Sequence, residues 1–172
     1  QHYQERLASI ALAGNVEALI IIDLELSDEQ KNLLRQAKMP FAGINHLQNQ
    51  DWPCVGSNNV YGARVAVSHL VALGHTRIGY IGDDFFDPFG FLTSQERYRG
   101  YCEVLTEHNI PILDNYFAVG HHDYEVARAL CRKMMMQEVP PTAIFAMSDI
   151  QALGCVAACR ELGLHTPDDI SV

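Results

Sequence analysis

Short apolar runs alternate along the chain with longer stretches in which apolar residues recur every three or four positions. Short runs predict strands, and the three- to four-residue spacing predicts the apolar face of a helix. The run 18–22 is apolar throughout, which predicts a strand buried on both faces, as in a parallel sheet covered by helices. The other strands that the pattern predicts are 41–45, 54–57, 77–82, 116–120, 143–147 and the beginning of one at 170–172.

The predicted helices lie between these strands, and several have recognisable ends. Ser27 and Gln30 form a capping box, Asn58 or Asn59 caps a later helix, and Ser94 is expected to cap the helix after the loop 83–93. The predicted helices are 3–13, 27–38, 59–73, 94–105, 124–136 and 150–162. The apolar faces predicted for two of them consist of Ala63, Ala66, Val67, Leu70 and Leu73, and of Ala152, Cys155, Val156 and Cys159.

This alternation of strands and helices with short connections predicts an α/β fold with doubly wound parallel sheets. In such sheets ligands bind at the carboxyl ends of the strands. The strict alternation begins near Asn58, which predicts a boundary between two lobes at that point. The loops expected to carry function follow Ile22, Asn45, Ser57, Gly82, Gly120 and Met147.

The composition is that of an ordinary globular protein, with 48% hydrophobic and 19% charged residues in 172. The formal net charge is -9, from 12 Lys and Arg against 21 Asp and Glu. A surface that binds nucleic acid neutralises phosphates with clustered cations, so this segment is not expected to touch DNA itself. We also expect no membrane partner, because no apolar run approaches the roughly 20 residues of a spanning helix.

Cysteine spacing and missing motifs exclude several kinds of site. The cysteines are odd in number and include no C-x-x-C, which indicates a reducing cytoplasm rather than a disulfide framework or a zinc ribbon. The sequence contains no glycine-rich nucleotide motif and no G-x-S-x-G nucleophile motif. His121, His122 and Asp123 lack a further ligand at suitable spacing, so no metal is predicted. We therefore expect neither a cofactor nor catalysis.

Two positions near strand ends are candidates for ligand binding, each with a structural alternative. Arg97 follows the long loop, and its planar guanidinium suits ligand hydroxyls or a carboxylate. The competing interpretation is a surface arginine, like Arg99. Ser148 and Asp149 follow another strand, where the aspartate fits either ligand binding or helix capping.

The loop 83–93 is both acidic and aromatic. Asp83 and Asp84 fit either an acidic pocket that holds magnesium or accepts phosphate, or a solvated turn. Exposed aromatic rings are unfavourable, so those of the loop either pack beneath it or stack on a flat ligand such as a sugar ring. They are Phe85, Phe86, Phe89 and Phe91.

Several stretches between residues 55 and 172 match one family pattern in order and spacing. They are Val55-Gly56-Ser57-Asn58-Asn59, Gly74-His75 with Arg77-Ile78, Tyr80-Ile81-Gly82, Arg97 with Gly100-Tyr101, Pro141 to Phe145, Ser148-Asp149, and Gly163-Leu164 with Pro167 to Val172. The chain therefore resembles the lactose-repressor/galactose-repressor (LacI/GalR) family of transcription regulators. The segment before residue 55 also fits, less distinctively.

The resemblance implies the two-lobed, periplasmic-binding-protein-like fold, with a small effector in the cleft between the lobes. Residues 1–57 then correspond to part of the amino-terminal lobe, and 58–172 to most of the carboxyl-terminal lobe. Family members begin with a DNA-binding helix-turn-helix, which is absent from this chain, so the resemblance implies an interior piece that is truncated at both ends. It also implies a homodimer that reads operator DNA and responds to a sugar, nucleoside or purine.

The resemblance assigns the effector contacts position by position. Asn58 stands where many members have Asp, and Ser148 where many have Asn, so a charge and an amide donor are lost. His122 falls at a position that is usually aromatic. These departures put the effector's identity in question more than the fold. The implied contact residues are Arg97, Asn58, Ser148, His122, Thr93 and Phe91.

These expectations combine into one mechanism with three rivals. An effector that binds one conformation better than another shifts the population and so repositions the linked DNA-binding domains. The rivals are a secreted solute-binding protein of a transporter, an enzyme on a doubly wound sheet, and a purely structural module. An upstream signal peptide would favour the solute-binding protein, and turnover of a metabolite would favour the enzyme. The absence of a melting shift with any sugar or nucleoside would favour the structural module.

Overall fold

The computed structural model describes residues 10, 16–22, 26–44, 52–86 and 91–172. The chain divides into two compact units, Gln1–Asn58 with Pro88–Phe91, and Asn59–Asp87 with Leu92–Val172. The assignment of these units to the two lobes of the family stays a prediction. Each unit is built around its own parallel sheet.

Within the described residues, the first unit is built from a three-stranded sheet and the helix that follows its first strand. Its elements are β1 (Leu19–Ile22), α2 (Asp28–Gln36), β2 (Phe41–Ile44) and β3 (Cys54–Val55). The strands are ordered β1-β2-β3 and all pairs are parallel. The predicted capping box is confirmed, because the Gln30 amide donates to Ser27 Oγ and the Ser27 amide donates to Gln30 Oε1.

The core of the first unit lies on one face of β1. Ile21 packs with Leu34 of α2 and with Trp52, the only tryptophan in the chain. Ile20 and Ile22 point the other way and are 71% and 59% exposed, so the expectation that both faces are buried is wrong for this strand. A strand is buried on both faces only when each face of its sheet is covered, and α2 covers one of the two faces. The helix predicted at 3–13 lies outside the described residues except for residue 10, which is helical.

The second unit alternates helices and strands throughout. Its strands are ordered β5-β4-β6, and every pair is parallel. Ser171 forms an isolated parallel bridge to Ala143, at the position where the sequence predicts the beginning of a further strand. The elements are α3 (Asn59–Ala72), β4 (Ile78–Gly82), α4 (Thr93–Glu107), η1 (Asp114–Tyr116), β5 (Phe117–Val119), α5 (Tyr124–Met135), β6 (Ala143–Ala146) and α6 (Asp149–Glu161).

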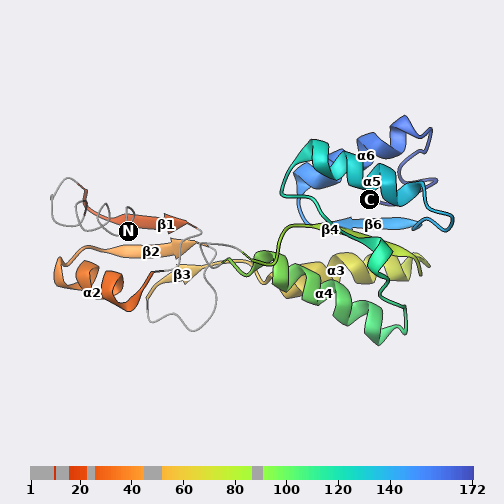
Figure 1. Cartoon of the computed structure of the whole chain (residues 1–172). Coiled ribbons are helices and arrows are strands. Elements are labelled where there is room, and N and C mark those ends of the chain that lie inside the picture. The colour runs from red at the N-terminus through yellow and green to blue at the C-terminus, as the bar shows by residue number, and fades with distance from the viewer. Residues whose placement is uncertain (1–9, 11–15, 23–25, 45–51, 87–90) are drawn as a thin grey trace. The chain divides into compact units, whose positions relative to one another are not determined.

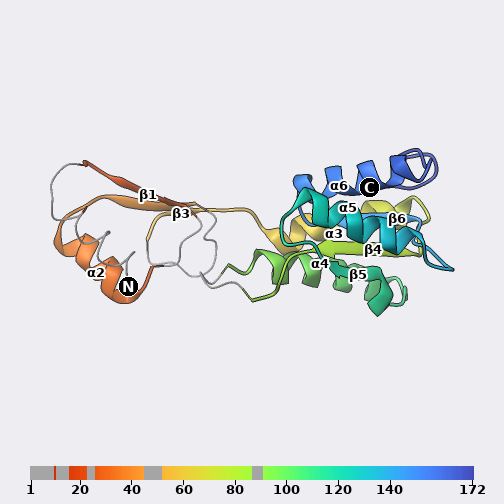
Figure 2. The same cartoon turned by 45° about the horizontal axis from the view of Figure 1, so that its top comes forward.

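Helices cover both faces of this second sheet, as Figures 1 and 2 show: α3 and α4 lie on one face, and α5 and α6 on the other. The central strand β4 is consequently buried along its whole length. The doubly wound α/β class predicted from the sequence is therefore confirmed. One core cluster lies beneath each helix pair, with Tyr80 in one and Ile81 in the other, because neighbouring residues of a strand point to opposite faces.

A glycine brings the helices of each pair into close contact. A Cβ at Gly100 of α4 would lie 2.5 Å from the Val60 carbonyl oxygen of α3. A Cβ at Gly154 of α6 would lie 2.5 Å from the Tyr124 carbonyl oxygen of α5. Real Cβ atoms do not approach so closely, so any larger residue would push the paired helices apart.

Several details of the predicted helices are wrong. In α3 the buried positions are 63, 67 and 70, whereas Ala66 is exposed because it lies to one side of the buried stripe. Leu73, predicted as the last residue of this apolar face, follows the end of α3 and is 61% exposed. In α6 Val156 is 38% exposed. Ser94 does not cap α4, since the helix begins one residue earlier and its cap position is Leu92. Among the described residues, no helix combines the length and apolar character needed to cross a lipid bilayer.

Candidate functional site

The carboxyl ends of β4, β5 and β6 meet at one edge of the second sheet, because the three strands are parallel. We call this the carboxyl edge, and define it by the residues that follow each strand: Asp83 after β4, Gly120 to His122 after β5, and Met147 with Ser148 after β6. It is the position at which open α/β sheets bind their ligands.

Arg97 of α4 lies at the carboxyl edge and is partly buried. Its Nε donates to Asn59 Oδ1 at 3.1 Å, and its Nη1 donates to the carbonyl oxygen of Met147. A guanidinium carries five N–H groups, and those on Nη2 meet no acceptor within the described part of the chain. The side chain is therefore held in place with donors left for a ligand.

The orientation of Arg97 depends on α3 as well as on α4. Asn59, the first residue of α3, accepts from Arg97 through Oδ1 and donates through Nδ2 to Glu96 Oε2 at 2.9 Å. This pair of bonds fixes which way the amide faces. The residue that contacts Arg97 is thus Asn59, whereas Asn58, predicted as an effector contact, is exposed and ends the first unit.

Gln151 of α6 connects the strand ends to one another. It is fully buried, and its Nε2 donates to the Gly82 carbonyl oxygen at 3.2 Å and to Asp83 Oδ1 at 2.7 Å. Its Oε1 accepts from Ser148 Oγ at 3.0 Å. Ser148, another predicted contact, therefore has its hydroxyl proton engaged within the protein, and only the oxygen lone pairs stay open to a ligand donor.

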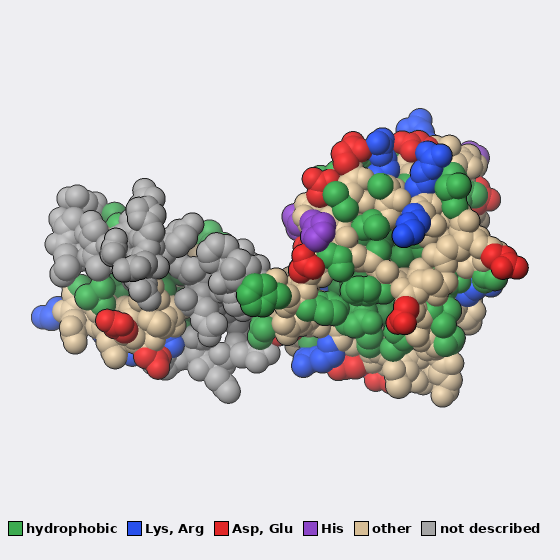
Figure 3. Space-filling view, viewed as in Figure 1, with side chains coloured by type: hydrophobic (Ala, Val, Ile, Leu, Met, Phe, Trp, Pro, Cys, Tyr) green, Lys and Arg blue, Asp and Glu red, His purple; other side chains and the backbone are tan. Residues whose placement is uncertain are grey.

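His121 and His122 form an exposed pair with the aspartates that follow β4. His122 Nδ1 lies 3.3 Å from Asp83 Oδ2, and its backbone amide also donates to Asp83. His121 Nδ1 lies 3.0 Å from Asp84 Oδ2. Figure 3 shows histidine and acidic side chains side by side on the second unit. The acidic turn thus anchors the loop after β5, and among the described residues no group of three or more His, Cys, Asp or Glu is arranged to hold a metal.

The remaining predicted contacts fall in different places. Thr93 is the first residue of α4, partly buried and one helical turn before Arg97. Phe91 is also partly buried but belongs to the first unit. The structure thus brings Arg97, Ser148 and His122 to one edge, and Thr93 to the same helix as Arg97. Their role in binding an effector stays a prediction.

The structure bears out one of the two alternatives for the aromatic loop at Phe85, and stacking on a ligand stays a prediction. The Phe85 ring lies 5.0 Å from that of Tyr98 and 5.7 Å from that of Phe117, so it packs against the second unit. Phe86 is 82% exposed. Phe89 lies outside the described residues.

Sequence reasoning missed Gln151 and Asn59. A signal for Gln151 existed, because it is a polar residue three positions after Ser148 in a helix whose inward side is otherwise small and apolar. Asn59 was considered only as a helix cap, and its neighbour was assigned the ligand role. Asp83 was noted, but as a pocket residue or a solvated turn rather than as the acceptor that joins Gln151 to His122.

Three cysteines of the second unit pack in its core. Cys131 Sγ and Cys159 Sγ are 3.9 Å apart, and Cys131, Cys155 and Cys159 are buried. The contact with Cys131, together with burial, raises the pKa of the Cys159 thiol. Cys131 and Cys159 are therefore protonated packing groups, and Cys155 is buried beside them, so Cys155 and Cys159 pack as the sequence predicted.

Comparison with known proteins places this arrangement in a family. Residues 67–172 match the model of the periplasmic binding protein-like domain. A curated relative, the HTH-type transcriptional repressor PurR of Photorhabdus laumondii, is 34% identical over 172 residues, covering 98% of this chain and 49% of the relative.

Two solved structures have the same fold. One is a regulatory protein of the LacI family from Chloroflexus aggregans, with a TM-score of 0.81, 28% identity, and coverage of 97% of this chain and 59% of the other. The second is a putative ribose operon repressor from Burkholderia thailandensis, with a TM-score of 0.69, 29% identity, and coverage of 99% and 62%. The chain spans about half the length of the curated relatives that it matches.

Proposed function

The chain belongs to the periplasmic binding protein-like family, among its LacI/GalR transcription regulators, and from this premise we propose that it is the region that binds a small-molecule effector. The single observation that carries the proposal is Arg97, whose guanidinium is fixed at the carboxyl edge with the N–H groups of Nη2 unpaired among the described residues. A fixed, partly buried cation with open donors suits a polar organic ligand better than it suits a packing role.

The ligand class that we propose is a sugar or a similar hydroxyl-rich metabolite. Besides Arg97, the carboxyl edge presents the Ser148 oxygen, the ring of His122 and the carboxylate of Asp83. Acceptors next to a guanidinium complement hydroxyl groups, which both donate and accept. A relative described as a putative ribose operon repressor supports a sugar, and nucleosides and purines are the alternatives to test.

We propose regulation by a population shift. The whole regulator is a homodimer that reads operator DNA through a helix-turn-helix, and the effector binds one of its conformations more tightly than the other. The difference between the two binding free energies sets how far the equilibrium moves. A regulator of this kind binds and releases its effector unchanged.

The experiment is a binding measurement on the full-length protein that contains this chain. Ribose, glucose, cellobiose, adenosine and hypoxanthine are first screened by thermal shift, and each compound that raises the Tm is measured by calorimetry. Replacing Arg97 with alanine should weaken binding of that compound by more than about 1.5 kcal/mol, because hydrogen bonds from a charged group are lost. The fold should be retained.

Arg99 is the matched control. It lies on the same helix, is 61% exposed and pairs with Glu103 at 3.6 Å. Arg99→Ala should leave the dissociation constant of the effector unchanged, since the guanidinium of Arg99 is exposed to solvent and faces Glu103. Equal affinities for wild type and Arg97→Ala, or no binding of any compound in the set, would contradict the proposal. Sedimentation of the full-length protein as a monomer would contradict the dimer.

A further inference from the structure

Tyr80 stands in the middle of β4 with its side chain completely buried. Its ring lies among other aromatic rings at centroid distances from 5.1 to 5.8 Å. The neighbours are Tyr98, Tyr101, Phe117 and Phe145. Packing of this kind requires only the ring, and phenylalanine would supply it equally well.

The hydroxyl of Tyr80 is what the packing does not explain. Among the residues that the structure describes, Tyr80 Oη is the one buried side-chain nitrogen or oxygen without a hydrogen-bond partner. An unpaired buried hydroxyl loses its bonds to water and gains none in return, so such groups are rare in folded proteins and require an explanation.

The position of the hydroxyl indicates where a partner would be. A Cβ at Gly82 would lie 2.7 Å from Tyr80 Oη and 2.3 Å from Cε1. The end of the ring therefore covers the last residue of β4 and points to the carboxyl edge. Burial raises the pKa of the Tyr80 phenol well above its ordinary value, and the charges of Arg97 and then Asp83 act on it next most strongly. The phenol is thus neutral and lies within electrostatic range of the candidate site.

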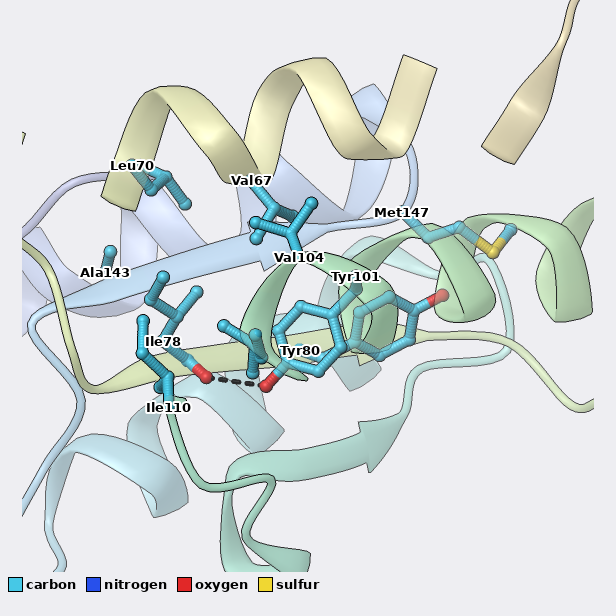
Figure 4. Close-up of a cluster of buried hydrophobic side chains, with 10 residues drawn as sticks. Val67, Leu70, Ile78, Tyr80, Tyr101, Val104, Ile110, Ala143 and Met147 are labelled. Carbon is cyan, nitrogen blue, oxygen red and sulfur yellow. Dashed lines mark hydrogen bonds between the residues drawn. The ribbon is translucent and has the colours of Figure 1, made fainter. Parts of the chain in front are cut away.

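Tyr101 provides a direct comparison inside the same cluster. It is 2% exposed, but its hydroxyl donates to the Ile78 carbonyl oxygen at 2.8 Å. Figure 4 shows the two hydroxyls directed to opposite ends of β4, that of Tyr101 toward Ile78 and that of Tyr80 toward the side on which Met147 is drawn. The tyrosine that points away from the carboxyl edge has a partner in the protein, and the one that points to it has none.

We propose that Tyr80 is a specificity-determining residue of the effector site, whose hydroxyl exchanges a hydrogen bond with a hydroxyl or carbonyl group of the bound effector. This inference rests on the proposed function. Since Tyr80 is completely buried, a covering side chain must move when the effector arrives. Met147 is suited to this, because it belongs to the same cluster, is 8% exposed and has a flexible, unbranched side chain. Its carbonyl oxygen is already held by Arg97.

The test replaces each tyrosine with phenylalanine in the full-length protein. Tyr80→Phe should raise the dissociation constant of whichever of ribose, glucose, cellobiose, adenosine or hypoxanthine binds by roughly three- to tenfold, the range for one neutral hydrogen bond. Its Tm without effector should be equal to or higher than that of the wild type, because an unpaired polar group is removed. Tyr101→Phe should lower the Tm and leave the dissociation constant unchanged.

A deoxy analogue separates a contact from a structural effect. For an effector with hydroxyl groups, the analogue that lacks the group bound by Tyr80 should bind wild type and Tyr80→Phe equally well. An unchanged dissociation constant for Tyr80→Phe overturns the inference, and so does a lowered Tm, which would show that the hydroxyl already has a partner in the free protein. If Arg97→Ala still loses binding in those cases, the proposed function stands. If wild type binds none of the compounds, the function fails and the role of Tyr80 fails with it.

Discussion

At the scale of single residues, polar side chains inside the second unit connect segments that are far apart in the sequence. Gln151 hydrogen-bonds to the end of β4 and to the residue before α6, and Asn59 joins the start of α3 to Arg97 and Glu96. Buried networks of this kind stabilise one arrangement when every member has a partner. The carboxyl edge is therefore fixed from both faces of the sheet before any ligand arrives.

Gln151 gives the residue-scale prediction. Gln151→Met keeps the size of the side chain but leaves the Gly82 carbonyl and the Ser148 hydroxyl without this partner, so the free energy of unfolding should fall by about 1–3 kcal/mol. Gln95→Met is the control, since Gln95 is exposed and makes one bond to the Phe85 carbonyl oxygen. Urea unfolding of both variants measures the difference, and equal midpoints would contradict the structural role of Gln151.

Residue-scale features were only partly predictable. Arg97 was found because it follows a strand and a loop at the ligand end of the fold and because a family pattern includes it. The distinction between Asn58 and Asn59 was out of reach, because it depends on the residue at which α3 starts, and helix ends shift by a residue or two without changing the apolar pattern. The partner of Ser148 and the unpaired hydroxyl of Tyr80 are tertiary facts that no local pattern contains.

At the scale of elements, the apolar spacing was sufficient. The strands and helices predicted within the described residues are present, with ends that differ by a few residues, except that the strand predicted at 170–172 is reduced to an isolated bridge at Ser171. The spacing did not show which residues at the edges of a helix's apolar face are covered by neighbouring elements. Leu73 and Val156 continue the apolar rows of α3 and α6 yet are exposed, because cover depends on the neighbouring helix rather than on the row itself.

The helix pairs give the element-scale prediction. Gly154→Ala should lower the free energy of unfolding by about 1–3 kcal/mol, because the added Cβ forces α5 and α6 apart. Gly62→Ala on α3 should do the opposite and raise it by about 0.5–1 kcal/mol, since nothing lies within 4 Å of its Cβ position and alanine favours a helix. Thermal or urea unfolding distinguishes the two, and a stabilising Gly154→Ala would show that the helices can separate without cost.

At the scale of the whole molecule, the sequence predicted the fold class and the family but not the identity of the effector. Doubly wound sheets follow from alternation alone, whereas the effector depends on a few side chains whose neighbours come from other elements. The sequence resemblance predicts that those at positions 58, 148 and 122 depart from the family pattern. The net charge of -9 is also a property of the whole molecule, because it sets the electrostatic potential that the entire chain presents to a partner.

That charge gives the prediction for the whole chain. Residues 1–172 alone should show no binding to duplex DNA by fluorescence anisotropy at roughly physiological salt, because 12 cations against 21 anions give a net negative charge that repels the phosphates. The full-length regulator should bind under the same conditions. Sequence-independent binding by residues 1–172 that weakens with added salt would reveal a basic surface and contradict the expectation.

Trp52, 6% exposed in the core of the first unit, has a practical use. No other residue of the chain is a tryptophan, and all tyrosines except Tyr3 belong to the second unit. Indole emission therefore monitors the first unit, and phenol absorbance comes mainly from the second. A single denaturation series followed with both chromophores would reveal whether the units melt together or one after the other, with no dye attached and no residue replaced.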